Sequence, residues 1–316
     1  MTSIARTLAA VSVVVIGACA ESQRPGPAGP SQTTITIGGR VTTLQTGEPV
    51  SNAFIRVRPG GETHSDASGM FSRVAAPGEL AMLLSAPGHL IRGLSLIADE
   101  SRTNFAVDMI SAAPPFSEPY YREFVRGERD FGRLEPLRRW TQAPRIFFVT
   151  RTTDAGDEVP DVVIDAMEEL AIQTMPLFTG GQFVPAQMAR GPVPPAVPVG
   201  WIIVESFSNG IPGSPGAGGT AAIGANPGRI RLLFDPQPFN GGTCRFHMAG
   251  AFSHELVHAL GFYHVSAGTW TLGNQCLPVL PEAIYHARIA YSRPVGNTHP
   301  DLDPAPAAPP APIIVR

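Results

Sequence analysis

The stretch HELVHALGFYH, residues 254–264, places three histidines and one glutamate close together in a chain that has 8 histidines in all. On an α-helix, His254 and His258 lie one turn apart on the same face, so both imidazoles can approach one metal ion at about 2.0–2.1 Å. Glu255 lies beside them and can reach a water at that ion without being a ligand. The spacing therefore predicts a metal centre on a helix.

A third ligand requires the chain to leave this helix. Gly261 permits the exit, because a residue without a Cβ adopts the left-handed conformation that ends a helix with little strain. His264 then follows on the departing segment and completes a set of three imidazoles. The chance expectation for the whole HExxHxxGxxH pattern in this composition is roughly one in ten thousand or less. The alternative interpretation is a set of histidines packed in a core.

The pattern resembles that of the metzincin clan of zinc endopeptidases, matched here at His254, Glu255, His258, Gly261 and His264. The resemblance implies that the three histidines ligate Zn²⁺. It also implies that Glu255 is the general base when a zinc-bound water hydrolyses a peptide bond. In metzincins a sheet, an active-site helix and a C-terminal helix follow one another in the chain, and the same order is expected here.

One feature departs from the metzincin pattern. Members of that clan place a methionine in a tight turn beneath the metal, and this chain has no methionine after Met248. By spacing, Leu272 is expected in that place, with Trp270 as the second candidate. The methionine is not itself a ligand, so an apolar residue can support the site in its stead.

Residues 33–113 are expected to form an all-β sandwich, because short alternating stretches are separated by Gly, Pro and Asp turns. Part of this region, GRVTTLQTGEPVSNAFIRVRPGGETHSDASGMFSRV, resembles the carboxypeptidase regulatory-like, transthyretin-type domain. The family's D-x-x-G-x-F turn is matched by Asp66, Gly69 and Phe71. The resemblance implies a spacer or binding module. The expected strands are TITIGGRV, AFIRVRP, GMFSRVA, LAMLLSAPGHL and TNFAVDMI.

Residues 144–303 are expected to form an α/β (α+β) domain, the metzincin-like catalytic domain, because strands alternate with helices. A helix should begin at Pro160 and end near Gly180 and Gly181. The strand expected at TAAIGA could pair with an extended substrate. Residues 114–143, in which arginines and acidic residues recur at helical spacing, are expected to form a linker helix. The other expected elements are the strands PRIFFVT, GWIIVESF and RIRLLFD and the helix PEAIYHARIAY.

Residues 1–18 are expected to be a signal peptide, because one cation, Arg6, precedes an apolar run too short to span a bilayer. The run ends in IGAC, residues 16–19, which resembles a bacterial lipobox. This resemblance implies a lipid on Cys19, a tether over residues 19–32, and attachment to a membrane of the cell envelope, with the outer membrane as the expected destination, facing the periplasm or the cell surface. The alternative is a plain secretory signal with an incidental cysteine.

Two further cysteines, Cys244 and Cys276, bracket the histidine stretch. In an oxidising envelope compartment they are expected to form a disulfide, the alternative being two unpaired thiols. Residues 304–316 form a tail rich in Pro and Ala, which predicts an extended or disordered segment.

The remaining chemistry-bearing residues suggest structural roles. His247 and His286 are expected to cap or pack, and Tyr285 and Tyr291 to fill a helix interface rather than to stabilise an oxyanion. The sequence NTHPDLDP suggests a turn rather than a calcium site at Asp301 and Asp303.

The formal net charge of -3 gives no indication of a nucleic-acid partner. All basic side chains apart from histidine are arginines, which excludes lysine nucleophiles. The sequence thus predicts a multidomain, lipid-anchored zinc endopeptidase acting on a peptide or protein substrate, and it leaves the oligomeric state open. Two alternatives share the same residues. One is a non-catalytic envelope lipoprotein with a degenerate zinc scaffold and a binding sandwich, and the other is a zinc amidase acting on cell-wall peptides.

Overall fold

The computed structural model describes residues 34–236, 247–266 and 281–305, and the part of the chain from Thr34 onward is one compact unit. Several predictions fall outside the described residues: the signal peptide, Cys19 and the tether, the Cys244–Cys276 pair, Leu272 and Trp270, and the tail from residue 306. Within the described residues, every helix is too short or too polar to pass through a bilayer.

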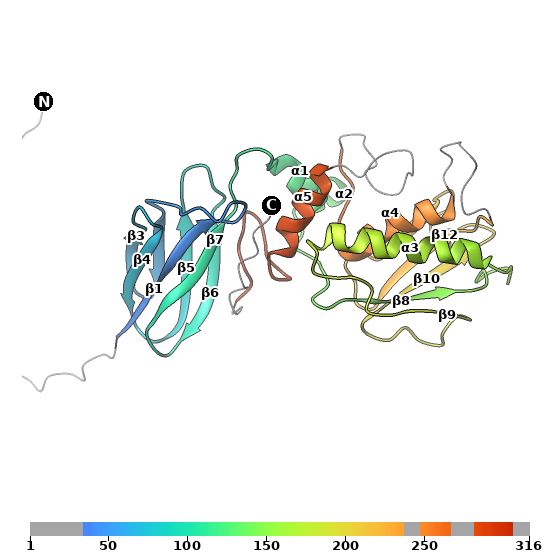
Figure 1. The fold of residues 1–316 in the computed structure, drawn as a ribbon, viewed down its shortest axis with the longest axis horizontal. Helices are drawn as coiled ribbons and strands as arrows, with labels where there is room; N and C mark the ends of the chain where they lie inside the picture. Colours follow the sequence, from blue (N-terminus) through green and yellow to red (C-terminus); the bar gives the residue numbers. More distant parts are fainter. Residues whose placement is uncertain (1–33, 237–246, 267–280, 306–316) are drawn as a thin grey trace, which may run out of the picture. The chain divides into compact units, whose positions relative to one another are not determined.

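The N-terminal part is a β-sandwich of two sheets, as the sequence predicted (Figure 1). In one sheet, β1 pairs with β4 in antiparallel and with β7 in parallel orientation. The other sheet is antiparallel, with strand order β3-β2-β5-β6. The strands are β1 (Ile35–Thr43), β2 (Phe54–Arg58), β3 (Gly61–His64), β4 (Met70–Ala75), β5 (Gly78–Ser85), β6 (Arg92–Ala98) and β7 (Arg102–Met109).

Strand β5 shows why the sandwich forms. Leu80, Met82 and Leu84 are buried in the core, and the residues between them are exposed. This period-two alternation predicts a strand with one buried face. The chain was expected to stay extended to Leu90, but β5 ends at Ser85 because a turn follows, in which the His89 N–H donates to the Ala86 carbonyl at 3.2 Å.

Two sandwich strands were not predicted from the sequence. In β3 three of four residues are exposed, so it lacks an apolar alternation, and it is held by pairing with β2. Most of β6 is buried, including Gly93, against which Leu302 packs so closely that a Cβ on the glycine would meet Leu302 Cδ2 at 2.7 Å. Strand β3 thus depends on its pairing with the neighbouring β2, whereas part of β6 packs against a residue distant in sequence.

The following part contains a five-stranded sheet with strand order β11-β12-β10-β8-β9. Strands β8, β9, β10 and β12 are parallel, and β11 is an antiparallel strand at one edge. Strand β9 was not predicted, whereas β8, β10 and β12 match expected strands. Strand β11 covers only the first two residues of the expected strand TAAIGA, because a turn follows in which the Ala225 N–H donates to the Ala222 carbonyl. Their bounds are β8 (Arg145–Val149), β9 (Met188–Gly191), β10 (Trp201–Phe207), β11 (Gly219–Ala221) and β12 (Gly228–Leu233).

Three helices accompany this sheet: α3 (Asp161–Phe178), α4 (Met248–Leu260) and α5 (Pro281–Tyr291). Helix α3 follows Pro160, and Gly180 and Gly181 lie just beyond its end with φ of 64° and 77°, as expected. Figure 1 shows α3 beside α4, and α4 also contacts β11 and β12. The helix that carries the histidine motif is therefore placed next to the edge of the sheet.

The expected linker helix in residues 114–143 is replaced by two short helices, α1 (Glu118–Phe124) and α2 (Glu128–Phe131). The break has a conformational cause, because Gly127 between them has a left-handed φ of 64°. Tyr121 and Phe124 of α1 are almost fully buried and belong to the same apolar core as α3 and α4. This segment is thus packed into the α/β part.

Candidate metal centre

Helix α4 is bounded by His247 at its N-terminus and by Gly261 at its C-terminus. His247 is the N-cap, and its Nδ1 accepts a hydrogen bond from the Gly250 N–H at 3.0 Å, which confirms its expected capping role. Gly261 is the C-cap, with φ of 118°, and its N–H donates to the His258 carbonyl at 2.9 Å. The chain therefore turns away from the helix where the pattern requires it.

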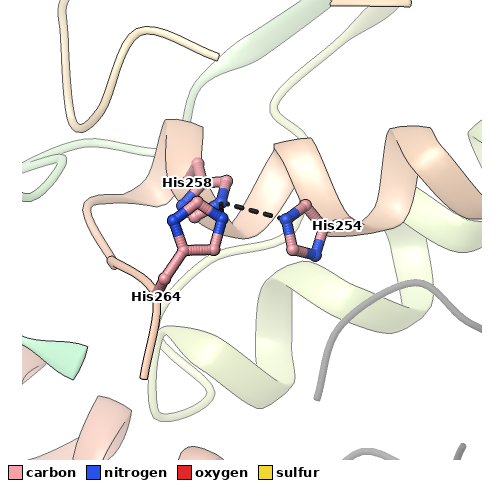
Figure 2. A group of neighbouring side chains, drawn as sticks. All are labelled: His254, His258 and His264. Carbon is pink, nitrogen blue, oxygen red and sulfur yellow. Dashed lines mark hydrogen bonds between the residues drawn. The ribbon is translucent and has the colours of Figure 1, made fainter. Parts of the chain in front are cut away.

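The three histidines of the motif converge on one point (Figure 2). His258 Nε2 lies 3.0 Å from His254 Nε2 and 3.1 Å from His264 Nε2. Nitrogens bound to one tetrahedral ion at 2.0–2.1 Å are about 3.3 Å apart. The cluster thus has nearly the spacing that a single ion requires, with two imidazoles from α4 and the third from the segment after Gly261.

The second ring nitrogens of two of these histidines have partners. His258 Nδ1 lies 2.7 Å from the Phe262 carbonyl, to which it donates as Nδ1–H, and His264 Nδ1 lies 3.3 Å from Asp130 Oδ2. Both contacts leave Nε2 with a lone pair directed at the cluster. Burial, together with the neighbouring His254, lowers the pKa of His258 to about 3. This imidazole is therefore neutral at pH 7 and can bind a cation without first losing a proton.

Glu255 is buried next to the cluster, with 5% of its surface exposed. Burial raises the pKa of its carboxyl to about 8, because the charged form loses its hydration. A divalent cation at the three histidines would oppose this effect and favour the carboxylate. Gly219 in the edge strand β11 lies close to this side chain, so the edge strand borders the site.

The donor set fits a transition metal better than a hard cation. Three imidazole nitrogens suit zinc, copper, iron or nickel, whereas magnesium and calcium take oxygen ligands. Among the described residues three imidazoles form the cluster, and three protein ligands would leave a fourth tetrahedral position, as in catalytic zinc sites. The cluster can therefore hold a metal ion.

Other residues singled out in the sequence lie outside this cluster. His286 and Tyr291 are buried in helix interfaces, as expected, and the Tyr291 hydroxyl donates to the Leu260 carbonyl at 2.9 Å. The turn expected at Asp301 is present, because Thr298 and Leu302 exchange two backbone hydrogen bonds of 2.7 and 2.8 Å. The carboxylates of Asp301 and Asp303 form ion pairs with Arg293 and Arg92.

The residues of α1 and α2 that contact the segment around His264 were not predicted from the sequence. Asp130 lies beside His264, although 134 positions separate them, and Glu123 and Arg129 contact the residues that follow it. Their only local signal was the mixture of acidic and basic residues, which is typical of any solvated helix.

No family model matches the chain, and no curated protein matches it. Among solved structures, it is similar to a DUF3823 family protein from Parabacteroides merdae, with 13% identity, a TM-score of 0.21, and coverage of 25% of this chain and 46% of that chain. It is also similar to a 9R-lipoxygenase from Cyanothece, with 12% identity, a TM-score of 0.19, and coverage of 50% and 25%. The chain spans less than half of either structure, and likenesses this weak carry no argument.

Proposed function

We propose that this protein is a metzincin-like zinc endopeptidase in which His254, His258 and His264 hold Zn²⁺ and Glu255 is the general base. The observation that carries the proposal is the convergence of three imidazole Nε2 atoms beside a buried carboxyl group. A purely structural zinc site is usually closed by four protein ligands. Three ligands with an adjacent glutamate that is not one of them favour catalysis.

The metal ion and Glu255 would have different roles in the hydrolysis. Bound Zn²⁺ would supply a Lewis acid that polarises the scissile carbonyl and lowers the pKa of a water toward ~7. Glu255 would take a proton from the water that attacks the carbonyl carbon, and would later deliver this proton to the departing amine. Burial removes hydration from the charged form of Glu255 and raises the pKa of its carboxyl group, which makes it a stronger base than an exposed glutamate.

The substrate is proposed to bind along β11. This strand lies at the edge of the sheet and pairs with β12 on one side. The other side of an edge strand offers backbone N–H and C=O groups to an extended peptide. Because Gly219 of β11 lies against Glu255, a peptide added there would pass close to the general base.

Glu255→Gln tests the endopeptidase directly, because glutamine keeps the size of the side chain but cannot accept the proton. The full chain should bind about one zinc ion. Glu255→Gln should keep that zinc, and hydrolysis of a diverse peptide library should fall by ~10²–10⁴-fold. Glu79→Gln, the same change at an exposed position in β5, is the matched control and should leave hydrolysis unchanged.

Two other results would redirect the proposal. If the wild-type chain binds zinc, cleaves no peptide and is indistinguishable from Glu255→Gln, the site is a scaffold and the protein is a non-catalytic lipoprotein. If cleavage is confined to cell-wall peptides, the same residues serve an amidase. Removal of zinc in His258→Ala is expected under all three functions, so it tests the metal site alone.

We also propose that the protein is anchored to the cell envelope by a lipid on Cys19, on the strength of the lipobox-like sequence. The expected outcome is partition of the mature protein into detergent, which Cys19→Ala abolishes. A soluble and unmodified mature wild-type protein would refute the anchor without affecting the metal site.

A further inference from the structure

The third histidine of the cluster is held differently from the other two. His254 and His258 are fixed by α4, and each has less than a tenth of its surface exposed. His264 lies beyond Gly261 on a non-helical segment, and its side chain is 35% exposed. The placement of its imidazole therefore depends on contacts from another part of the chain.

Those contacts come from the α1–α2 segment. Asp130 Oδ2 lies 3.3 Å from the backbone nitrogen of His264 and 3.3 Å from its Nδ1. The first contact fixes the backbone of the ligand, and the second fixes its ring. With the proton of the neutral ring on Nδ1, donated to the carboxylate, the lone pair of Nε2 points to the cluster, where His258 Nε2 is 3.1 Å away.

The residues on both sides of His264 are held by the same segment. The Tyr263 N–H donates to the Phe124 carbonyl at 2.8 Å, and the rings of Phe124 and Phe262 stack with centroids 4.7 Å apart. These contacts hold the two residues that precede the ligand, close to where the chain leaves α4.

The residues after His264 are bound by charged side chains. Arg129 Nη1 donates to the Val265 carbonyl at 2.5 Å. The carboxylate of Glu123 accepts from the backbone N–H and the hydroxyl of Ser266, each at 2.6 Å. Every residue from 262 to 266 is thus in contact with α1 or α2.

The α1–α2 segment is itself firmly placed. Tyr121 and Phe124 anchor α1 in the core, and Arg126 is fully buried, where it donates to the carbonyl and side-chain oxygens of Asn297. Gly127 fits closely against the Tyr263 ring, since a Cβ there would lie 3.0 Å from two ring carbons. Because the α1–α2 segment is held in place, its contacts can fix the position of the His264 imidazole.

We infer that Asp130 is a positioning residue for the metal site, which holds His264 in the orientation and tautomer needed for binding. The inference rests on the proposed metal site and deepens it. Carboxylates that accept from a ligating histidine typically contribute 10–100-fold to metal affinity. Asp130 is a quarter exposed, and its contact of 3.3 Å with His264 is at the long end of the hydrogen-bond range. Solvent and distance therefore weaken the interaction between the carboxylate and the imidazole but do not abolish it.

The test measures zinc affinity of the full chain by competition with a chromophoric chelator. Asp130→Ala should weaken zinc binding by about 10–100-fold, and Asp130→Asn, which keeps an acceptor but loses the charge, should lie between Asp130→Ala and wild type. Asp99→Ala, at an exposed carboxylate in the β6–β7 connection, is the matched control and should bind as tightly as wild type. The Co²⁺-loaded chain adds a spectroscopic readout, because displacement of His264 changes the ligand-field absorption.

Each outcome decides the inference. If wild type takes up no metal, the proposed site and this inference fall together. If wild type binds zinc and Asp130→Ala binds it equally tightly with an unchanged Co²⁺ spectrum, only the role of Asp130 is overturned. The melting temperatures of the metal-free proteins show whether each variant is as stably folded as wild type. Should Asp130→Ala melt early, the nearly isosteric Asp130→Asn carries the comparison, and wild-type affinity in that variant would refute a role for the carboxylate charge.

Discussion

Glu255 lies directly against the backbone of Gly219, so closely that a Cβ built on the glycine would come within 2.6 Å of both Cγ and Oε1 of the glutamate. Real Cβ atoms essentially never approach so near, so even the smallest side chain at this position must displace the carboxylate or the edge strand. The space between β11 and α4 therefore requires a glycine, and it places the proposed general base beside the strand proposed to bind substrate.

Gly219→Ala should reduce peptide hydrolysis by up to about 100-fold, because a displacement of about 1 Å at a reacting group can cost that much. Zinc content should remain at the wild-type level, since Glu255 is not proposed as a ligand. Gly191→Ala is the control, because it makes the same change in β9, at the other edge of the sheet, where a Cβ would come no nearer than 3.2 Å to Phe147 Cζ. Wild-type turnover in Gly219→Ala would show that Glu255 is not positioned by this contact.

Gly261 is the second glycine that the site depends on, for two separable reasons. Its φ of 118° is strained for any other residue, and a Cβ would lie 1.9 Å from the Arg138 carbonyl oxygen. Gly261→Ala should lower the free energy of unfolding by more than the ~1–3 kcal/mol expected of conformational strain alone, and should weaken zinc binding. Urea denaturation of the metal-free chain and chelator competition measure the two effects.

Gly156→Ala separates strain from collision in that experiment. Gly156 also has a left-handed φ, of 75°, but a Cβ there meets nothing within 4 Å. It should therefore show the conformational cost alone and keep wild-type zinc affinity. Equal losses of stability in the two variants would mean that the Arg138 carbonyl moves aside freely.

The histidine cluster and its helix could be predicted because their information is local. The four-residue spacing of His254 and His258 and the glycine three residues later specify one helix face and its exit, whatever the rest of the chain does. The alternation in β5 is local in the same sense. These patterns do not depend on the tertiary arrangement, so the helix and the strand could be predicted from the sequence alone.

The contacts that complete the site are of another kind. Asp130 and His264 are 134 positions apart, and Gly219 meets Glu255 from a strand of three residues. No periodicity marks such pairs, because they arise when packed elements meet. Strand β9 was missed for the same reason, since its pairing with β8 gives it the extended form that its own residues do not demand. The sequence therefore predicted the three histidines that converge, and not the residues that hold them in place.

Arg293 lies in a buried group of ion pairs. Its guanidinium is fully buried, donates to Asp301 at 2.8 Å, and also pairs with Asp108 at 2.5 Å. Burial alone would raise the pKa of Asp301, but Arg293 and Arg92 reverse this effect and hold that pKa below its usual value.

Arg293→Met should lower the free energy of unfolding by about 3–5 kcal/mol, because buried carboxylates lose their counter-ion. Arg133→Met removes an arginine whose side chain is 76% exposed and which pairs with Glu135, so it should cost at most about 1 kcal/mol. Denaturant titration of both variants at neutral pH gives the comparison. Similar small losses in both would show that water reaches the Arg293 group.

His286 is expected to make the folding stability of the protein depend on pH. This residue is fully buried in α5, accepts a hydrogen bond at Nε2 from the Ser117 N–H at 3.0 Å, and donates from Nδ1 to the Glu282 carbonyl at 2.7 Å. Both nitrogens are thus used by the neutral ring, and a proton added at Nε2 would face the Ser117 N–H. Burial lowers the pKa of His286 to about 4.

The sign of the pH effect follows from this lowered pKa. An unfolded histidine titrates near ~6.5, so between about pH 6.5 and 4 the unfolded chain binds a proton that the folded chain does not. The stability contributed by neutral His286 is therefore complete above pH 6.5 and is lost as the pH falls toward 4. At about 1.36 kcal/mol per pH unit, the loss amounts to roughly 3 kcal/mol at most.

His286→Gln should remove this dependence, because glutamine does not titrate. Urea denaturation of the metal-free chains from pH 7.5 to 4.5 should show wild type losing more stability than the variant, with the gap between them narrowing as the pH falls. Metal-free protein is used so that protonation of the zinc ligands does not act through metal release. His64→Gln, at an exposed position in β3, is the matched control for the change of residue type. A gap between wild type and His286→Gln that stays constant with pH would mean that the folded chain accommodates a charged His286, contrary to its buried hydrogen bonds.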